Sequence, residues 1–160
     1  MDEMIAKYQG LIDLTVTTED VVRLGEEIDI LLKGLYHVES SEFEQKLERE
    51  VRVRVAAEIR KLLQASADQS KEEIKVLLGS VNRVVGALPI VKLVLAFEPS
   101  EQVIANISHW CRMNLERQVV IDLSIDRSIL GGAVIIYRGK FYDLTLRKKL
   151  QEIFEKGAFI

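Results

Sequence analysis

The apolar pattern of this chain changes once, at Leu88–Pro89. Before this point apolar residues recur every three or four positions, which is typical of helices that bury one face. After it, runs rich in β-branched residues alternate with helical segments. Pro89 favours an extended Leu88 and cannot continue a helix. We therefore predict an α+β chain of two domains, residues 1–88 and residues 89–160, which abut without a linker.

The first domain is predicted to be a bundle of about four helices. Gly10 interrupts the first helix, and Thr18 caps the second helix, which ends around His37. Ser40 or Ser41 caps the third helix. The fourth follows a capping box formed by a serine and a glutamate, and its apolar stripe ends the domain. In order, the expected helical segments are residues 4–14, 18–37, 40–62 and 70–85.

The third of these helices is predicted to be long and continuous. Its apolar residues recur mostly at i+4 between Phe43 and Leu62. On its outer face, opposite charges stand at the i,i+4 spacing that favours ion pairs within a helix. These expected pairs are Glu48–Arg52 and Glu50–Arg54.

The second domain is predicted to have the order β-α-β-β-α. The second and third strands are joined by a short connection, so we expect them to pair antiparallel. The first strand joins the second through a helical crossover. Arg138–Gly139 is a predicted turn, and the product is a small mixed sheet with helices on it. The expected strands are residues 90–97, 119–125 and 129–137, and the expected helices are residues 100–115 and a segment holding Leu146, Leu150, Ile153 and Phe154.

Composition and charge exclude several classes of protein. The chain is 48% hydrophobic and 29% charged, unlike a disordered chain. Its one cysteine, Cys111, can form neither an internal disulfide nor a thiol-rich zinc site. No apolar run approaches the roughly 20 residues of a membrane span, and no secretory signal is expected. We therefore predict a soluble protein of a reducing compartment.

The charge is distributed unevenly between the two domains. Residues 1–88 carry 12 basic and 17 acidic side chains, whereas residues 89–160 carry 10 basic and 8 acidic ones. The net charge of the whole chain is −3. Because nucleic-acid binding depends on an excess of basic residues, this balance argues against nucleic acid as the main partner.

No pattern in the sequence indicates a catalytic site. His109 and Cys111 stand two apart on a predicted helix, so they point to different sides and cannot share a proton or a metal ion. Gly131–Gly132 lies inside a predicted strand, where glycine permits a close backbone approach; a phosphate ligand is the alternative. Ser128 lies in no nucleophile elbow. We expect no catalytic residue, no cofactor and no metal ion.

Residues 119–140, VVIDLSIDRSILGGAVIIYRGK, resemble the C-terminal signature of the ATP synthase delta subunit family, whose mitochondrial relative is the oligomycin-sensitivity-conferring protein. In that family a strand ends in Asp, a short apolar step leads to Gly-Gly, and a second strand precedes a Gly turn, an Asp and a final helix. The chain departs from the family with Asp143-Leu144-Thr145, where Asp-Gly-Ser is usual, and with about four predicted helices instead of six. The matching residues, all expected to be structural, are Asp126, Leu130, Gly131, Gly132, Gly139 and Asp143.

This resemblance implies a non-catalytic stator subunit of a rotary ATP synthase, with no small-molecule substrate. The helical domain would bind the alpha subunits of the catalytic head, and the C-terminal domain would bind the b subunit of the peripheral stalk. Such a link couples rotation to ATP synthesis and proton transport. It implies a cytoplasmic location at the inner face of the plasma membrane, held there by the complex without direct insertion. The alternative is a regulatory or scaffolding module that binds protein or, less readily, RNA.

Two surfaces are candidates for these contacts. In the first domain Val21, Val22 and Leu35 lie partly off the main apolar stripe, which predicts an uncovered groove for a helix of the catalytic head. In the second domain the last helix carries a basic cluster, for which a solvated helix face is the alternative, and the chain ends in apolar residues. The candidate stalk contacts are Arg147, Lys148, Lys149, Phe159 and Ile160.

Overall fold

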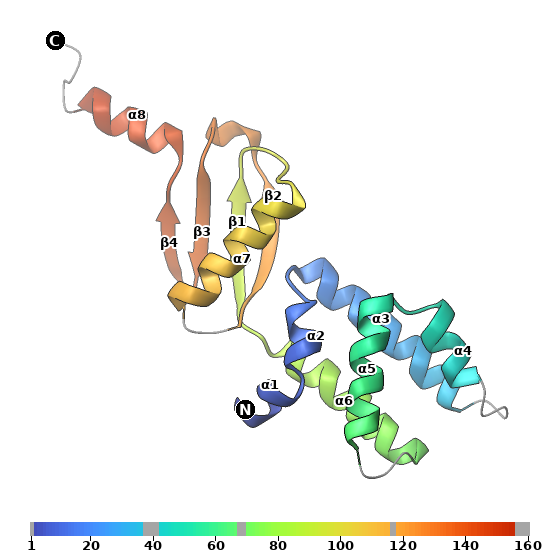
Figure 1. The fold of residues 1–160 in the computed structure, drawn as a ribbon. Helices are drawn as coiled ribbons and strands as arrows, with labels where there is room; N and C mark the ends of the chain where they lie inside the picture. Colours follow the sequence, from blue (N-terminus) through green and yellow to red (C-terminus); the bar gives the residue numbers. More distant parts are fainter. Residues whose placement is uncertain (1, 37–41, 67–69, 116–117, 156–160) are drawn as a thin grey trace. The chain divides into compact units, whose positions relative to one another are not determined.

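The computed structural model describes residues 2–36, 42–66, 70–115 and 118–155 (Figure 1). The chain divides into two compact units, Met1–Leu88 (unit 1) and Pro89–Ile160 (unit 2). Unit 1 is helical and unit 2 holds a four-stranded sheet, so the predicted α+β class is confirmed. That the two units are separate domains stays a prediction.

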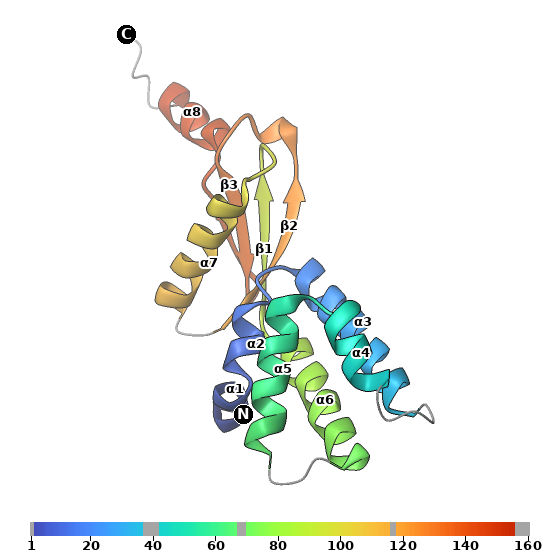
Figure 2. The same ribbon diagram turned by 45° about the vertical axis from the view of Figure 1, so that its right-hand side comes forward.

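Unit 1 is built from helices that share one apolar core. The helix α3 packs against α6 and α4 (Figures 1 and 2). The innermost side chains come from α3 to α6 and are Ile28, Leu31, Leu47, Ile59, Leu78 and Val81. The amphipathic stripes of the sequence therefore meet in one core. The described helices are α1 (Asp2–Lys7), α2 (Gln9–Asp13), α3 (Thr18–Leu35), α4 (Glu42–Arg49), α5 (Val53–Ala65) and α6 (Lys71–Gly86).

The starts of α3 and α6 have the capping residues that helices favour. Thr17, one residue before the expected cap, accepts a hydrogen bond from the Asp20 N–H, and the Asp20 carboxylate accepts one from the Thr17 N–H. Ser70 Oγ accepts a hydrogen bond from the Glu73 N–H at 3.3 Å. Each cap satisfies backbone donors that a helix leaves unpaired in its first turn.

Two helix boundaries differ from the prediction. The expected continuous helix over 40–62 is wrong, because α4 ends at Arg49 and α5 begins at Val53. At Arg52 the backbone is extended (ψ 135°), and its N–H donates to the Glu27 carboxylate instead of to a carbonyl of its own helix. Gly10 lies inside α2, and the first helical segment breaks instead at Tyr8.

The sheet of unit 2 has the strand order β2-β1-β3-β4. The strand β1 pairs with β2 in parallel through the predicted crossover by α7, and with β3 antiparallel. The expected antiparallel pairing of the second and third strands is therefore wrong. Unit 2 contains β1 (Ile90–Leu95), α7 (Glu101–Leu115), β2 (Val120–Ile125), the 3₁₀ helix η1 (Arg127–Ile129), β3 (Ala133–Tyr137), β4 (Lys140–Asp143) and α8 (Leu146–Glu155).

The connection after β2 explains this pairing. It forms η1 and places Leu130 (φ 63°) and Gly132 (φ 84°) in the left-handed region, so the expected strand over 129–137 begins only at Ala133. The chain passes the end of β1 and returns on its other side. β1 buries alternate apolar residues, Val91, Leu93 and Leu95, and gains a hydrogen-bonded neighbour on each edge.

The predicted turn at Arg138–Gly139 connects β3 to a strand that the sequence pattern did not indicate. Arg138 (φ 49°) and Gly139 (φ 75°) both have positive φ, as a two-residue type I′ hairpin requires. The strand β4 that follows pairs antiparallel with β3. Its sequence Lys-Phe-Tyr-Asp lacks apolar alternation, and its first three residues are exposed.

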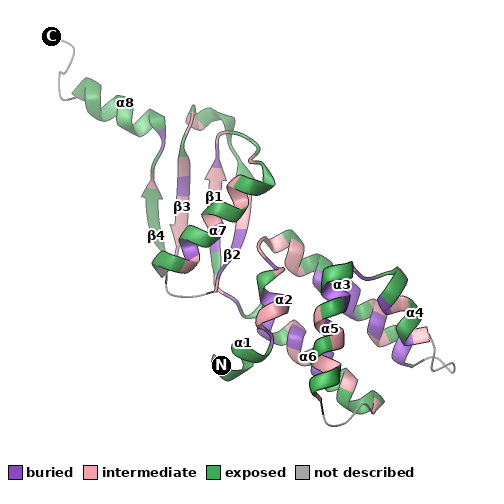
Figure 3. Ribbon diagram, in the orientation of Figure 1, coloured by how far each residue is buried: buried purple, intermediate pink, exposed green. Residues whose placement is uncertain are grey.

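The two helices of unit 2 differ in what they cover. α7 lies on one face of the sheet (Figures 1 and 2), where Cys111 and Ile107 pack with Val91 and Val119. Every side chain of α8 is exposed (Figure 3). The prediction of helices on the sheet is thus correct for α7 and wrong for α8.

Candidate protein-binding surfaces

The structure brings five of the six signature residues together at the start of α8. The β2–β3 connection supplies Gly131, whose carbonyl accepts a hydrogen bond from the Leu146 N–H at 2.9 Å. A Cβ atom on Gly131 would lie 2.7 Å from Leu146 Cδ1. At Gly132 a Cβ atom would overlap the Leu144 carbonyl oxygen and lie 3.0 Å from Thr145 Cα. The expected close backbone approach at this glycine pair is therefore present.

Asp126 and Asp143 each close a local turn. Asp126 Oδ1 accepts a hydrogen bond from the Ser128 N–H at 2.9 Å, and Asp143 Oδ1 accepts one from the Thr145 N–H at 3.0 Å. Hydrogen bonds from the side chain and then the backbone of Ser128 lower the pKa of Asp126. Those from the side chain and backbone of Thr145 lower the pKa of Asp143 in the same way. Both carboxylates thus shape the chain around α8.

These lowered pKa values predict a dependence of stability on pH. A carboxyl whose pKa is lower in the folded state stabilises the fold above its unfolded pKa, and this contribution is lost as the pH falls through the folded pKa. We expect Asp143→Ala to unfold at a lower temperature than the wild type at pH 7, with the gap narrowing below the ordinary aspartate value of 3.8. Thermal unfolding at pH 7, 5 and 3 measures this gap, and a gap that does not change with pH would contradict it.

Gly139 lies apart from the other signature residues. It occupies the β3–β4 turn, at the opposite end of the hairpin from the start of α8. No atom outside its own chain neighbours lies within 4 Å of the position that its Cβ would take. Glycine is therefore favoured at position 139 only because the turn needs a residue with positive φ.

The exposed helix α8 and the signature residue Leu130 together form a hollow of 480 Å³, here called the α8 hollow. The Leu130 side chain is 68% exposed. Its backbone has φ 63°, in the left-handed region, which is unfavourable for a leucine. Leu146 and Ile153 extend the exposed apolar surface along the helix. The hollow is lined by Leu130, Arg147, Leu150, Gln151, Phe154 and Glu155.

The predicted stalk contacts are only partly within the described residues. Arg147 lines the α8 hollow, and Lys148 and Lys149 are exposed on the same helix. Phe159 and Ile160 lie outside the described residues. The structure therefore combines a basic cluster with an apolar surface on α8.

In unit 1, two exposed valines lie in hollows. Val22, 62% exposed, lines a hollow of 390 Å³ beside the first turn of α3, and Val53, 83% exposed, lines one of 290 Å³ at the start of α5. Val21 is half-buried. Leu35 is buried, so its predicted place on an uncovered groove is wrong: it belongs to the core stripe of α3.

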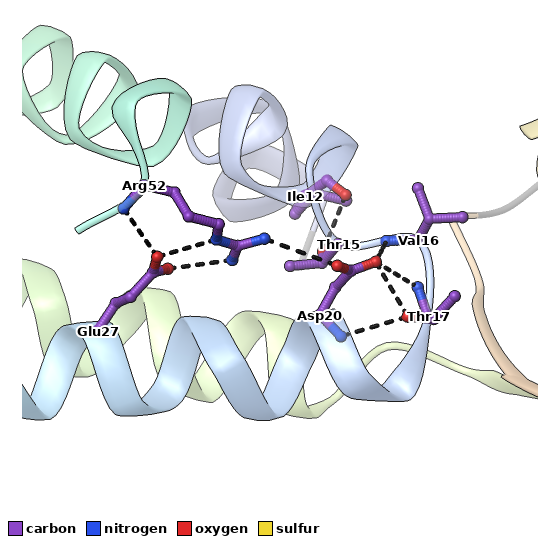
Figure 4. A network of polar contacts seen from close by, with 7 residues as sticks. All are labelled: Ile12, Thr15, Val16, Thr17, Asp20, Glu27 and Arg52. Atoms are coloured by element: carbon purple, nitrogen blue, oxygen red, sulfur yellow. Dashed lines mark hydrogen bonds and ion pairs between the residues drawn. The ribbon is translucent and has the colours of Figure 1, made fainter. Parts of the chain in front are cut away.

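Between these two hollows lies a polar network that the sequence analysis missed (Figure 4). Glu27 Oε1 accepts hydrogen bonds from the Arg52 N–H and Nε at 2.9 Å each, and its Oε2 accepts one from Nη2 at 3.0 Å. Arg52 Nη1 also lies 3.6 Å from Asp20 Oδ1. One signal was available: Glu27 follows Leu24 by three positions and precedes Leu31 by four, so it stands within an apolar stripe.

Comparison with known proteins agrees with this architecture. A family model described as ATP synthase delta (OSCP) subunit matches residues 15–156. The chain belongs to this delta family. Members of this family are structural subunits of the ATP synthase peripheral stalk. The matched residues include most of the helical unit as well as the C-terminal signature. None of the curated proteins compared with the chain matches it.

Leu144, which follows Asp143, is exposed and lies two residues before α8. Within the described residues no helix is long and apolar enough to cross a membrane. The same part of the chain gathers no three His, Cys, Asp or Glu side chains that could hold a metal ion.

Proposed function

We propose that this delta-family chain is the stator subunit that links the catalytic head of an ATP synthase to its peripheral stalk. Unit 2 binds the stalk b subunit, and unit 1 binds the alpha subunits of the head. Such a link resists the torque of the rotor, so that rotation remains coupled to ATP synthesis and proton transport. The subunit is held at the inner face of the plasma membrane by the complex, without inserting into the bilayer.

The exposure of α8 is the observation that carries this proposal. A ten-residue helix is marginal in water by itself, and most helices owe their stability to packing of an apolar face. Here the apolar residues Leu146, Leu150 and Ile153 are exposed together with Leu130. A helix of the stalk, laid against this surface, would bury these side chains.

The charged residues of α8 would set the orientation of the bound stalk helix. Arg147, Lys148 and Lys149 occupy its first turns, and Glu155 stands at its end. Charges at the rim of an interface mainly steer association, whereas buried apolar anchors set the lifetime of the complex. The proposed occupant is therefore an amphipathic stalk helix that carries acidic residues beside its apolar face.

Binding to the immobilised soluble part of b tests this surface. We expect Leu150→Ala to raise the dissociation rate about tenfold, because truncating an anchor near the centre of an interface costs more than about 1 kcal/mol and acts mainly on the dissociation rate. Replacing both Lys148 and Lys149 by Glu is expected to slow association and flatten its salt dependence. Val76→Ala, at an exposed valine of α6, serves as the control. If both α8 variants bind with wild-type rates at two salt concentrations, the stalk-facing surface has been misplaced.

The head contact is proposed on the end of unit 1 that carries Val22 and Val53. Both valines are exposed beside hollows. Asp20 lines the hollow beside Val22, and Arg52 lines the hollow beside Val53, so the two hollows carry opposite charges at these positions. An amphipathic helix from the alpha subunits would cover these valines. In the same binding experiment, isolated catalytic heads replace b, and the α8 variants are expected to bind the heads as the wild type does.

A further inference from the structure

We propose that the free edge of β4 binds an extended segment of the stalk polypeptide, which adds a fifth strand to the sheet. This inference rests on the proposed function, since the same partner would also cover α8. In the described part of unit 2 the sheet ends at β4 (Figure 1). β4 continues through Leu144 and Thr145 into α8, so its edge and the exposed helix follow one another along the chain.

The pairing register shows which backbone groups β4 presents. In an antiparallel ladder, alternate residues direct both N–H and C=O toward the neighbouring strand. The Leu144 N–H donates to the Ala133 carbonyl at 2.9 Å, so Tyr142 is the next residue of β4 directed at β3. Phe141 and Asp143 therefore direct their N–H and C=O groups away from β3. These four groups are a template for a further strand.

The side chains of β4 favour an apolar occupant. Phe141 pairs with Ile136 on the sheet face opposite α7, and Tyr142 pairs with Ile135 on the face that α7 covers. Phe141 is 63% exposed and Tyr142 is 48% exposed. Aromatic and β-branched side chains stabilise each other across neighbouring strands, so the expected segment has such residues on both faces.

The two sheet edges are protected differently. The other edge strand of the sheet is β2. On the face opposite α7 it carries the polar side chains of Asp122 and Ser124. Natural sheets use charged side chains, as Asp122 is here, to prevent a further strand from pairing at an edge. On β4 the acidic side chain is engaged in its own turn, because Asp143 Oδ1 accepts the Thr145 N–H. Lys140, the other charged residue of β4, is exposed beside the turn and directs its own N–H and C=O at β3. The part of the edge open to an added strand is therefore residues 141–143.

The short edge does not suit a second copy of this chain. β4 has four residues, and a strand extends roughly 3.3 Å per residue. Two such strands paired side by side would bury far less than the roughly 800 Å² per partner of a stable dimer interface. A stalk segment that also contacts α8 gains the remaining area from the helix.

Amide hydrogen exchange of the full-length chain, followed residue by residue by NMR, tests the added strand. In the free chain we expect the Phe141 and Asp143 amides to exchange at least tenfold faster than the Tyr142 amide, which is directed at β3. With saturating soluble b subunit, exchange at Phe141 and Asp143 is expected to slow at least tenfold. If exchange at both residues is unchanged in the complex, the edge inference is overturned.

A matched pair of substitutions gives a second readout. Phe141→Pro removes an N–H that the β3–β4 ladder does not use, and proline is tolerated on edge strands. Phe141→Ala removes the same aromatic ring and keeps the N–H. We expect the proline variant to bind b at least tenfold more weakly than the alanine variant, and equal affinities would overturn the edge inference. In that case a raised dissociation rate for Leu150→Ala leaves the proposed function intact, whereas a wild-type chain that does not bind b overturns both.

Discussion

Replacing Gly132 by valine is expected to lower the free energy of unfolding of unit 2 by about 3 kcal/mol, the sum of two costs. Gly132 has φ +84°, a conformation that costs other residues roughly 1–2 kcal/mol. Its Cβ would overlap the Leu144 carbonyl oxygen, and overpacking a filled site costs about 1–3 kcal/mol. Denaturant unfolding of the full chain measures the loss.

Gly139→Val is the matched control for this prediction. Gly139 also has positive φ, at +75°, but no neighbouring atom lies within 4 Å of its Cβ position. Only the conformational cost, about 1–2 kcal/mol, is expected there. Equal losses at both glycines would show that the close approach to Leu144 is not responsible. A Gly132→Val chain of unchanged stability that loses nucleotide binding would instead favour the phosphate-ligand alternative.

Glu27→Ala is expected to lower the free energy of unfolding of unit 1 by about 3 kcal/mol, at the lower end of the cost of breaking a buried ion pair. The Glu27 side chain is 6% exposed and accepts three hydrogen bonds from Arg52, one of them from its backbone N–H. Removing it leaves that N–H and the guanidinium with fewer partners. Arg52 is 29% exposed and keeps some contact with water, which limits the loss.

A surface ion pair provides the comparison. Lys61 lies 2.6 Å from Glu58 but is 69% exposed, and exposed pairs contribute less than about 1 kcal/mol. We expect Lys61→Ala to change stability by less than that amount. Glu27→Gln, which keeps an acceptor for the Arg52 N–H, is expected to fall between the two. A Glu27→Ala loss no larger than that of Lys61→Ala would contradict a structural role for the network.

The break between α4 and α5 shows where sequence patterns fail. The apolar residues from Phe43 to Leu62 keep helical spacing across the break, so periodicity alone predicts one helix. α4 ends at Arg49, and the Arg52 N–H donates to Glu27, 25 residues earlier, instead of to a carbonyl of a continuing helix. A contact between residues so far apart leaves no signal in the apolar spacing between Phe43 and Leu62.

The sheet of unit 2 and the candidate stalk-binding surface on α8 could also be predicted only in part from the sequence. The β1-α7-β2 crossover and the Arg138–Gly139 turn follow from local apolar runs and from a glycine at a turn, and both were predicted. The place of β3 beside β1 was not, because strand order depends on which edge gains more by pairing. Leu130 was identified from the family signature, but its exposure beside Leu150 depends on how the β2–β3 connection meets α8.

The sequence by itself therefore determined the α+β class, the family and most of the helices, because these depend on apolar spacing, caps and a local signature within about 30 residues. Only the tertiary structure decided that α8 leaves its apolar residues exposed, that β4 forms a free edge, and that Glu27 and Arg52 join α3 to the start of α5. The physical reason is that burial, strand order and buried ion pairs are set by residues distant in the chain, whereas helix spacing and turns are set by neighbours.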